Sequence, residues 1–199
     1  MSGNMNIDFF DRMAEKWDTI SEEYPDEINH ILDIADIRPN DIVLDGGTGT
    51  GVLIPYLASR LTETGWIDAY DISTGMLRVA HEKWAKLGKA RFVLGDIEHD
   101  RIFGAYDRIV LFCMLPHLDD PVAAVAKLCR DNLMPGGSLT IGFSCSKEKI
   151  NSCHAKKTGH VHSHFLDSAD ELADRLRFAG LNVDYTEDND RVYIVKVKN

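Results

Sequence analysis

The chain has 199 residues, of which 44% are hydrophobic and 27% charged, as in ordinary globular proteins. Its formal net charge of −10 disfavours a broad phosphate-binding surface, because nucleic-acid-binding proteins carry basic patches. No apolar run approaches the ~20 residues that span a bilayer, and the first residues lack the basic and apolar regions of a signal peptide. We therefore expect one domain, a cytoplasmic location and a small-molecule substrate, with no nucleic-acid or membrane partner. Both a monomer and a homodimer remain open.

Cysteine use agrees with that location. A chain without a signal peptide is expected to keep its four cysteines reduced: Cys113, Cys129, Cys145 and Cys153. Cys129 lies in an apolar helical pattern and is expected in the core.

Two helices are predicted at the start of the chain. Five apolar residues recur at helical spacing within residues 8–20: Phe9, Phe10, Met13, Trp17 and Ile20. This pattern predicts an amphipathic helix whose aromatic stripe packs on the domain, covers a bound ligand, or does both. Pro25 begins a second predicted helix, with apolar residues at 28, 31, 32 and 35.

The functional interpretation depends on residues 42–51. The continuous apolar run 42–44 predicts a central parallel strand that is covered on both faces. A helix is predicted over 52–61, and between the two lies a turn that begins with Asp45 and holds four glycines: Gly46, Gly47, Gly49 and Gly51. Glycines allow positive φ and a close approach of the backbone to a ligand. The strand–turn–helix order therefore predicts a nucleotide-type ligand at the carboxyl end of this strand.

Strands alternate with helices along the rest of the chain. We expect strands at 67–71, 90–94, 106–113, 138–143, 181–186 and 192–197. We expect helices at 73–87, 121–132 and 168–179, the last with a capping box of Ser168 and Glu171. The alternation predicts a doubly wound α/β sheet with both faces covered, which ends in a hairpin. Residues 144–164 show no clear element.

Acidic residues follow three of the predicted strands. Asp45 ends the first strand, Asp71 ends the second (71 − 45 = 26 residues later), and Asp96 follows the third. One Asp at a strand end is usually a turn former, but open α/β sheets bind ligands at the carboxyl ends of successive strands. The Asp71 carboxylate could accept hydrogen bonds from two ribose hydroxyls, and Asp96 from an exocyclic amino group.

The glycine spacing distinguishes between nucleotide ligands. The chain has Asp-x-Gly-x-Gly-x-Gly, not the Gly-x-Gly-x-x-Gly of dinucleotide-binding folds. No Lys-Ser or Lys-Thr follows the last glycine, as it would in a phosphate loop. An acid at the turn suits a ligand with a cationic amino group. The stretch Leu44-Asp45-Gly46-Gly47-Thr48-Gly49-Thr50-Gly51 resembles the first motif of class I S-adenosylmethionine-dependent methyltransferases, in particular the small-molecule, UbiE-like (methyltransferase type 11) group.

This resemblance implies a Rossmann-like seven-stranded sheet of order 3-2-1-4-5-7-6 with the last strand antiparallel. It also implies S-adenosylmethionine as the cofactor, and a lid formed by residues 1–36 within a single 1–199 domain. Tyr24 either reaches the methionine end of the cofactor or only packs. The resemblance assigns cofactor binding to thirteen residues: Asp45, Gly46, Gly47, Thr48, Gly49, Asp71, Ile72, Met76, Gly95, Asp96, Ile97, Phe112 and Cys113.

The segment after the fourth strand is expected to line the methyl-transfer site. The resemblance puts Phe112 and Cys113 beside the methionine moiety and His117 near the acceptor. His117 is the candidate general base, and a structural or lining role is the alternative. The family's Asn/Asp-Pro-Pro-Tyr motif is absent, which counts against nitrogen-base and glutamine acceptors.

Residues 144–164 are rich in histidine and are expected to lie over the active site. His160, His162 and His164 alternate, so they would share one face of an extended segment. These three are the candidate ligands for Zn or Fe, although their spacing matches no standard zinc pattern. The alternative is that the segment lines the substrate pocket.

We therefore predict an enzyme that transfers a methyl group from S-adenosylmethionine to a small-molecule acceptor by in-line substitution. One alternative is an RNA or protein methyltransferase on the same fold. The other is a protein without catalysis that binds the cofactor and senses a metal or binds a partner.

Overall fold

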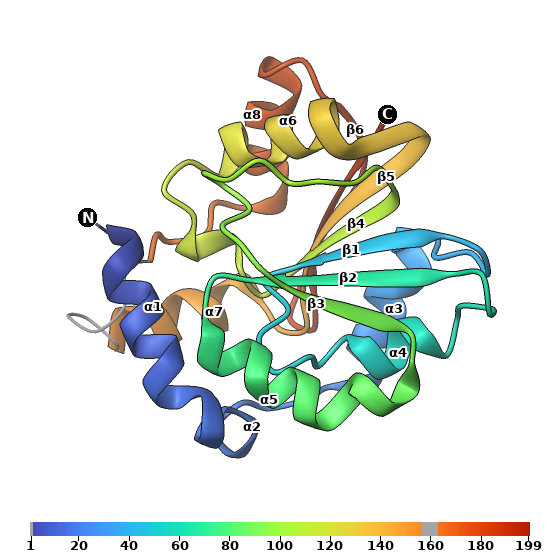
Figure 1. The fold of residues 1–199 in the computed structure, drawn as a ribbon. Coiled ribbons are helices and arrows are strands. Elements are labelled where there is room, and N and C mark those ends of the chain that lie inside the picture. The colour runs from blue at the N-terminus through green and yellow to red at the C-terminus, as the bar shows by residue number, and fades with distance from the viewer. Residues whose placement is uncertain (1, 157–162) are drawn as a thin grey trace.

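The computed structural model describes residues 2–156 and 163–199. Seven strands form one sheet in the order β3-β2-β1-β4-β5-β7-β6 (Figure 1). The strands are β1 (Ile42–Gly46), β2 (Trp66–Asp71), β3 (Ala90–Leu94), β4 (Tyr106–Phe112), β5 (Leu133–Phe143), β6 (Asn182–Asp188) and β7 (Tyr193–Lys198). Neighbours from β3 to β5 pair in parallel, and β7 is antiparallel to both β5 and β6. The predicted fold class and strand order are confirmed.

Helices cover both faces of this sheet. The helical elements are α1 (Ser2–Met13), η1 (Ala14–Lys16), α2 (Trp17–Ile20), α3 (Pro25–Ala35), α4 (Ile54–Ala58), α5 (Thr74–Trp84), η2 (Ala85–Leu87), η3 (Leu115–His117), α6 (Pro121–Asn132), α7 (Lys147–Lys156) and α8 (Ala169–Phe178). Helices α6 and α8 lie on one face, and α3, α4 and α5 lie on the other (Figure 1). None of the helices in the described part of the chain is long and apolar enough to cross a membrane.

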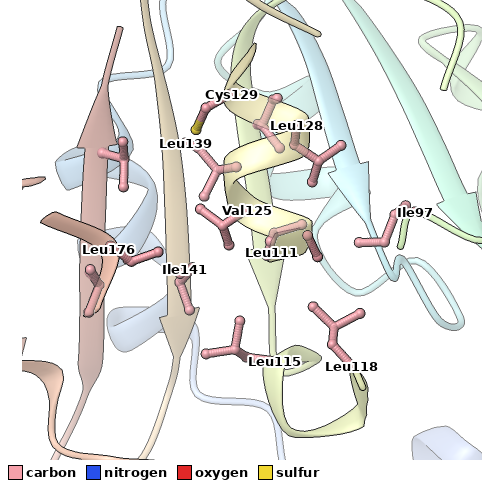
Figure 2. Packing of buried hydrophobic residues seen from close by; sticks show 14 of the residues in the cluster. Ile97, Leu111, Leu115, Leu118, Val125, Leu128, Cys129, Leu139, Ile141 and Leu176 are labelled. Carbon is pink, nitrogen blue, oxygen red and sulfur yellow. The ribbon is translucent and has the colours of Figure 1, made fainter. Parts of the chain in front are cut away.

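The alternation of side chains along the central strands produces two hydrophobic cores. Ile109 and Leu111 of β4 enter the core under α6 and α8, whereas Val110 and Phe112 enter the core under α3 and α4. Figure 2 shows Val125 and other residues of α6 packed over Leu111 and its neighbours on β5. Because both faces are buried, these strands read as continuous apolar runs in the sequence.

Some predicted boundaries are wrong. The single helix expected over 8–20 begins at Ser2 and is divided by the 3-10 turn η1, and the helix expected over 52–61 is reduced to α4. Strand β5, which we expected over 138–143, begins at Leu133, and its register to β4 shifts between Tyr106 and Arg108. Residues 144–164, for which no element was predicted, contain α7.

Candidate active site

A cavity of about 910 Å³ lies at the carboxyl ends of β1, β2, β3 and β4. Residues at or just after these strand ends form one part of its lining: Asp45, Gly47, Thr48, Gly49, Asp71, Ile72, Gly95, Asp96, Ile97, Phe112 and Cys113. The N-terminal helices and the segment after them supply another part: Asn6, Ile7, Phe10, Trp17, Asp18, Ser21, Glu22 and Glu23. The cavity thus lies where open α/β sheets bind ligands.

Two glycines of the turn after β1 have different structural roles. Gly49 has a φ of +56°, and an added Cβ would meet no atom within 4 Å, so this cavity-lining position faces open space. Gly51 has a φ of +82°, and an added Cβ would lie 2.6 Å from Trp84 Cδ1 and 2.9 Å from Ile54 Cδ1. Gly49 therefore keeps the cavity wall open, whereas Gly51 allows Trp84 at the end of α5 to pack against the turn.

Asp71 connects the ends of β1 and β2. Its Oδ2 atom accepts a hydrogen bond from the Gly49 N–H at 2.8 Å, and its Oδ1 atom accepts one from the Ser73 N–H at 2.9 Å. Burial raises the pKa of Asp71 to about 6, although the backbone hydrogen bonds act in the opposite direction. The two hydrogen bonds thus hold the carboxylate in a fixed orientation at the cavity wall. There it is less well solvated than it would be in water.

A second buried carboxyl group lies beside it. Asp45 is 1% exposed, and its Oδ2 atom accepts a hydrogen bond from the Thr48 hydroxyl at 2.7 Å. Burial raises the pKa of Asp45 to about 7, and the negative charge of Asp71 adds to the effect. Among the described residues no cation pairs with either carboxyl group, so the two favour a ligand that brings hydrogen-bond donors or positive charge.

The third predicted acid, Asp96, also lines the cavity. Its Oδ1 atom accepts hydrogen bonds from the N–H groups of Glu98 and His99 at 2.8 and 3.1 Å. Asp96 is therefore a turn former as well as a cavity residue. The apolar side chains of Ile72, Met76 and Ile97 also line this cavity.

The N-terminal helices are attached to α5 and to the glycine-rich turn by two carboxylates. Asp11 Oδ1 accepts hydrogen bonds from the Ser73 hydroxyl at 2.5 Å and from the Gly75 N–H at 2.8 Å. Asp18 accepts hydrogen bonds from the Thr50 hydroxyl at 2.5 Å and from Lys83 Nζ at 2.6 Å. These contacts hold Phe10 and Trp17 at the cavity.

The segment after β4 forms a further part of the lining. Cys113 has a φ of +54°, which is unusual for a residue with a Cβ, and its exposed surface faces the cavity. Although Cys113 is open to the cavity, the surrounding cavity wall desolvates its thiol and raises the thiol pKa to about 12, so the group is neutral at physiological pH. The ring of His117, also in the lining, lies 5.3 Å from that of Phe10 and 5.1 Å from that of His154 on α7, measured between centroids.

The structure brings together all of the predicted cofactor residues except one. Gly46 does not line the cavity, because it lies within the sheet, where an added Cβ would approach Leu111 Cδ2 to 2.7 Å. Tyr24 is also not among the lining residues. Its hydroxyl donates to Glu22 and accepts a hydrogen bond from Lys149 Nζ at 2.6 Å.

Of the three predicted metal ligands, only His164 lies among the described residues, and it belongs to none of the groups of three possible metal ligands found there. His160 and His162 lie outside the described residues, and His164 is exposed, with its N–H donating to the Pro116 carbonyl at 2.7 Å. Among residues 2–156 and 163–199, the one group of three possible metal ligands within 4.8 Å of one another is Glu98, His99 and Asp119. The Glu98 carboxylate already accepts hydrogen bonds from the N–H groups of residues 119 and 120.

Sequence reasoning missed several residues of the cavity. Ser144 follows β5 directly, so the rule that residues after parallel strands meet at one edge could have identified it. Asp18 and Trp84 have no such signal, because their place in the lining depends on how α2 and α5 dock. The contact of His154 with His117 depends on the path of α7, which the sequence pattern did not predict.

Comparison with known proteins identifies related sequences. A family model described as a methyltransferase domain matches residues 43–137. The chain is 27% identical over 184 residues to a malonyl-[acyl-carrier protein] O-methyltransferase of Marinomonas sp. (strain MWYL1), covering 87% of this chain and 65% of that protein. It is 28% identical over 153 residues to a ubiquinone biosynthesis O-methyltransferase of Vibrio parahaemolyticus, covering 72% of this chain and 63% of that protein. The chain thus spans less than two thirds of either relative.

The fold also matches solved structures. A SAM-dependent methyltransferase from Aquifex aeolicus superimposes with a TM-score of 0.70 at 24% sequence identity, covering 86% of this chain and 89% of that chain. This likeness bears on the fold, including the seven-stranded order described above.

Proposed function

We propose that this chain, which belongs to the class I S-adenosylmethionine-dependent methyltransferases, transfers a methyl group from that cofactor to a small-molecule acceptor. The observation that carries the proposal is the shared cavity wall formed by the glycine-rich turn, Asp45 and Asp71. Fold alone does not give function, so the argument rests on what these side chains offer a ligand.

The residues present fit the cofactor. The cavity volume of about 910 Å³ lies within the range of small-molecule and cofactor sites and leaves room for an acceptor. Asp71 would accept hydrogen bonds from the ribose hydroxyls, and Ile72 and Ile97 would flank the purine. Asp45, which is buried and has no cation beside it in residues 2–156 and 163–199, would lie toward the cationic amino group. Open space at Gly49 supports a close approach of the ligand to the turn.

The chain's own contribution to the reaction is alignment, exclusion of water and proton removal. When bound, the cofactor supplies an activated methyl group on a positively charged sulfur. Phe10 and Trp17, held by the anchored N-terminal helices, would cover the cavity as a lid. His117 would accept the proton of an acceptor that arrives protonated. The neutral thiol of Cys113 would act as a wall rather than as a nucleophile.

The charges of the lining favour an acceptor without a negative charge. Lys83 is the one lysine or arginine among the described lining residues, and its ammonium group already pairs with Asp18 at 2.6 Å. An anionic acceptor would therefore meet carboxylates without a free lysine or arginine to receive it. This supports a neutral small molecule over RNA, as does the net charge of −10.

Calorimetric titration with S-adenosylhomocysteine tests cofactor binding. We expect Asp71→Asn to weaken binding at least tenfold, because the amide offers one acceptor oxygen in place of two. The matched control is Asp184→Asn on the edge strand β6, which should bind as the wild type does. Absence of binding by the wild-type chain, or unchanged binding by Asp71→Asn, would refute the assignment.

Methyl transfer from a tritium-labelled donor tests the acceptor class. Cell extract separated into metabolite, RNA and protein fractions would serve as the source of acceptors. We expect label in the metabolite fraction. Label confined to RNA or protein would favour those alternatives, and binding of the donor without transfer to any fraction would favour a protein without catalysis.

A further inference from the structure

Three elements that are distant in the sequence meet at His117. The residue ends η3 and lines the cavity. The ring of Phe10 on α1 lies edge-on to the His117 ring, at 5.3 Å and an interplanar angle of 88°. The ring of His154 on α7 lies at 5.1 Å with an angle of 53°. The imidazole is thus flanked by two rings, one from the N-terminal helix and one from α7.

The orientation of α7 follows from the burial of Ile150. Ile150 is 6% exposed and belongs to the hydrophobic core under α6 and α8. His154 lies four residues later, so it shares the helix face of Ile150 and is directed toward the protein. Cys153, its neighbour, is exposed. The burial of Ile150 therefore determines which side chain of the next turn of α7 reaches η3.

Hydrogen bonds fix α7 relative to η3. The Asn151 side chain donates to the Leu166 carbonyl at 3.1 Å and accepts from the Leu166 N–H at 2.8 Å. Two residues before Leu166, the N–H of His164 donates to the carbonyl of Pro116 at 2.7 Å. Pro116 directly precedes His117. The chain that follows α7 thus returns to η3 and is bonded to both.

We propose that His154 is a positioning residue for His117: its ring holds the His117 imidazole in one orientation and one tautomer at the cavity, where it receives the proton of the methyl acceptor. This inference rests on the proposed role of His117. It assigns His154 a function through another residue, not contact with the acceptor or the cofactor.

The reaction requires such control because the two ring nitrogens of a neutral imidazole are not equivalent. One carries a proton and the other can accept one. In the transfer, the acceptor's X–H proton would move to the unprotonated nitrogen, the acceptor atom would form a bond to the methyl carbon, and the carbon–sulfur bond would break with its electron pair left on sulfur. A 180° flip of the ring would put a carbon where the accepting nitrogen had been, and a change of tautomer would present a protonated nitrogen; either would stop the first of these steps. Contacts with Phe10 and His154 restrict the flip.

The test uses ¹⁵N-labelled full-length protein, free and with S-adenosylhomocysteine. Correlations between the ring nitrogens and carbon-bound protons of His117 report its tautomer, and His117→Gln assigns them by their disappearance. In the wild type we expect one neutral tautomer with two well-separated nitrogen shifts. In His154→Ala we expect the two shifts to converge, because the ring then samples other orientations with other neighbours, and exchange between the two tautomers averages the shifts.

The matched control is His81→Ala. The ring of His81 packs on the ring of Phe92 at 5.3 Å, on α5 and away from η3, so this variant also loses one paired imidazole. It should leave the His117 signals as they are in the wild type. His154→Gln, which keeps a polar side chain without a ring, replaces His154→Ala if that variant fails to fold.

Unchanged His117 shifts in a folded His154 variant would overturn the positioning role. Equal convergence in His81→Ala would overturn it as well, because the effect would then not be specific to His154. The affinity for S-adenosylhomocysteine separates this result from the proposed function. We expect it to change by less than about twofold in His154→Ala, and a wild type that does not bind would refute the methyltransferase assignment instead.

Discussion

The Asp11 carboxylate accepts a hydrogen bond from the Ser73 hydroxyl at 2.5 Å and so joins the N-terminal helix to the start of α5. Asp11 also accepts from the Gly75 N–H at 2.8 Å, a free backbone donor of the first turn of α5. Ser73 in turn caps α5 by accepting from the Met76 N–H. A carboxylate at a helix N-terminus is favoured by the helix dipole. The pKa of Asp11 is lowered, with the Ser73 hydrogen bond as the largest cause.

Removing this carboxylate should loosen the N-terminal helix. We expect Asp11→Ala to lower the free energy of unfolding by about 1–2 kcal/mol, since charge-assisted hydrogen bonds are lost. It should also weaken S-adenosylhomocysteine binding several-fold, because Phe10 and Trp17 are carried by the same helices. Thermal unfolding and calorimetry measure the two effects. Asp8→Ala, an exposed acid on the same helix, is the control and should change neither; a matching loss in Asp8→Ala would contradict the anchoring role.

Alanine substitutions at two glycines should separate binding from stability. Both positions have positive φ, so each variant carries backbone strain of about 1–2 kcal/mol. Gly49→Ala adds a methyl group to open space at the cavity wall and should abolish most S-adenosylhomocysteine binding with little further loss of stability. Gly51→Ala forces its Cβ to within 2.6 Å of Trp84 and should unfold at a markedly lower temperature. Equal melting temperatures for the two variants would show that the close contact with Trp84 does not destabilise Gly51→Ala.

Loss of the Asp45 proton should make the ligand-free protein less stable as the pH rises. Its pKa is about 7 in the folded chain, against an ordinary value of 3.8, so the folded state holds the proton more tightly between these limits. The stabilising proton is lost as the pH rises through 7, at a cost of at most about 4 kcal/mol. Asp45→Asn should remove this contribution. The free energy of unfolding, measured with urea, should then differ less between pH 5 and pH 8 than it does in the wild type. An identical pH dependence in the two proteins would argue against a buried, ionisable Asp45.

Arg108 should matter for stability but not for binding. It is 4% exposed at the amino end of β4, and it donates to the Asp36 carbonyl at 2.8 Å while lying 3.5 Å from the buried carboxylate of Asp41. Arg108→Met leaves that carboxylate without its cation and should cost about 3 kcal/mol, or roughly 6–12 °C in melting temperature. S-adenosylhomocysteine affinity should stay unchanged, because the cavity lies at the opposite ends of the strands. Arg130→Met, at an exposed pair with Asp131, is the control, and a loss as large as that of Arg108→Met would show that burial is not the cause.

Local sequence determined the sheet and most of one cavity wall. Apolar runs define the buried strands, and the glycines after β1 adopt the positive φ that their lack of a Cβ permits. Because parallel strands end at a common edge, Asp45, Asp71 and Asp96 could be placed at one site from their positions alone. These inferences need only short-range rules, since each concerns a residue and the strand that it follows.

Contacts between distant segments were decided by the tertiary structure. Helix α7 was not predicted, because Ile150 gives it one large buried residue rather than an apolar stripe. His154 reaches His117 only after Asn151 and the returning chain have fixed that helix. Likewise, Asp11 looks like an ordinary surface acid until α1 docks on α5. Such pairings depend on loop paths and packing across tens of residues, for which the periodicity of a sequence carries no signal.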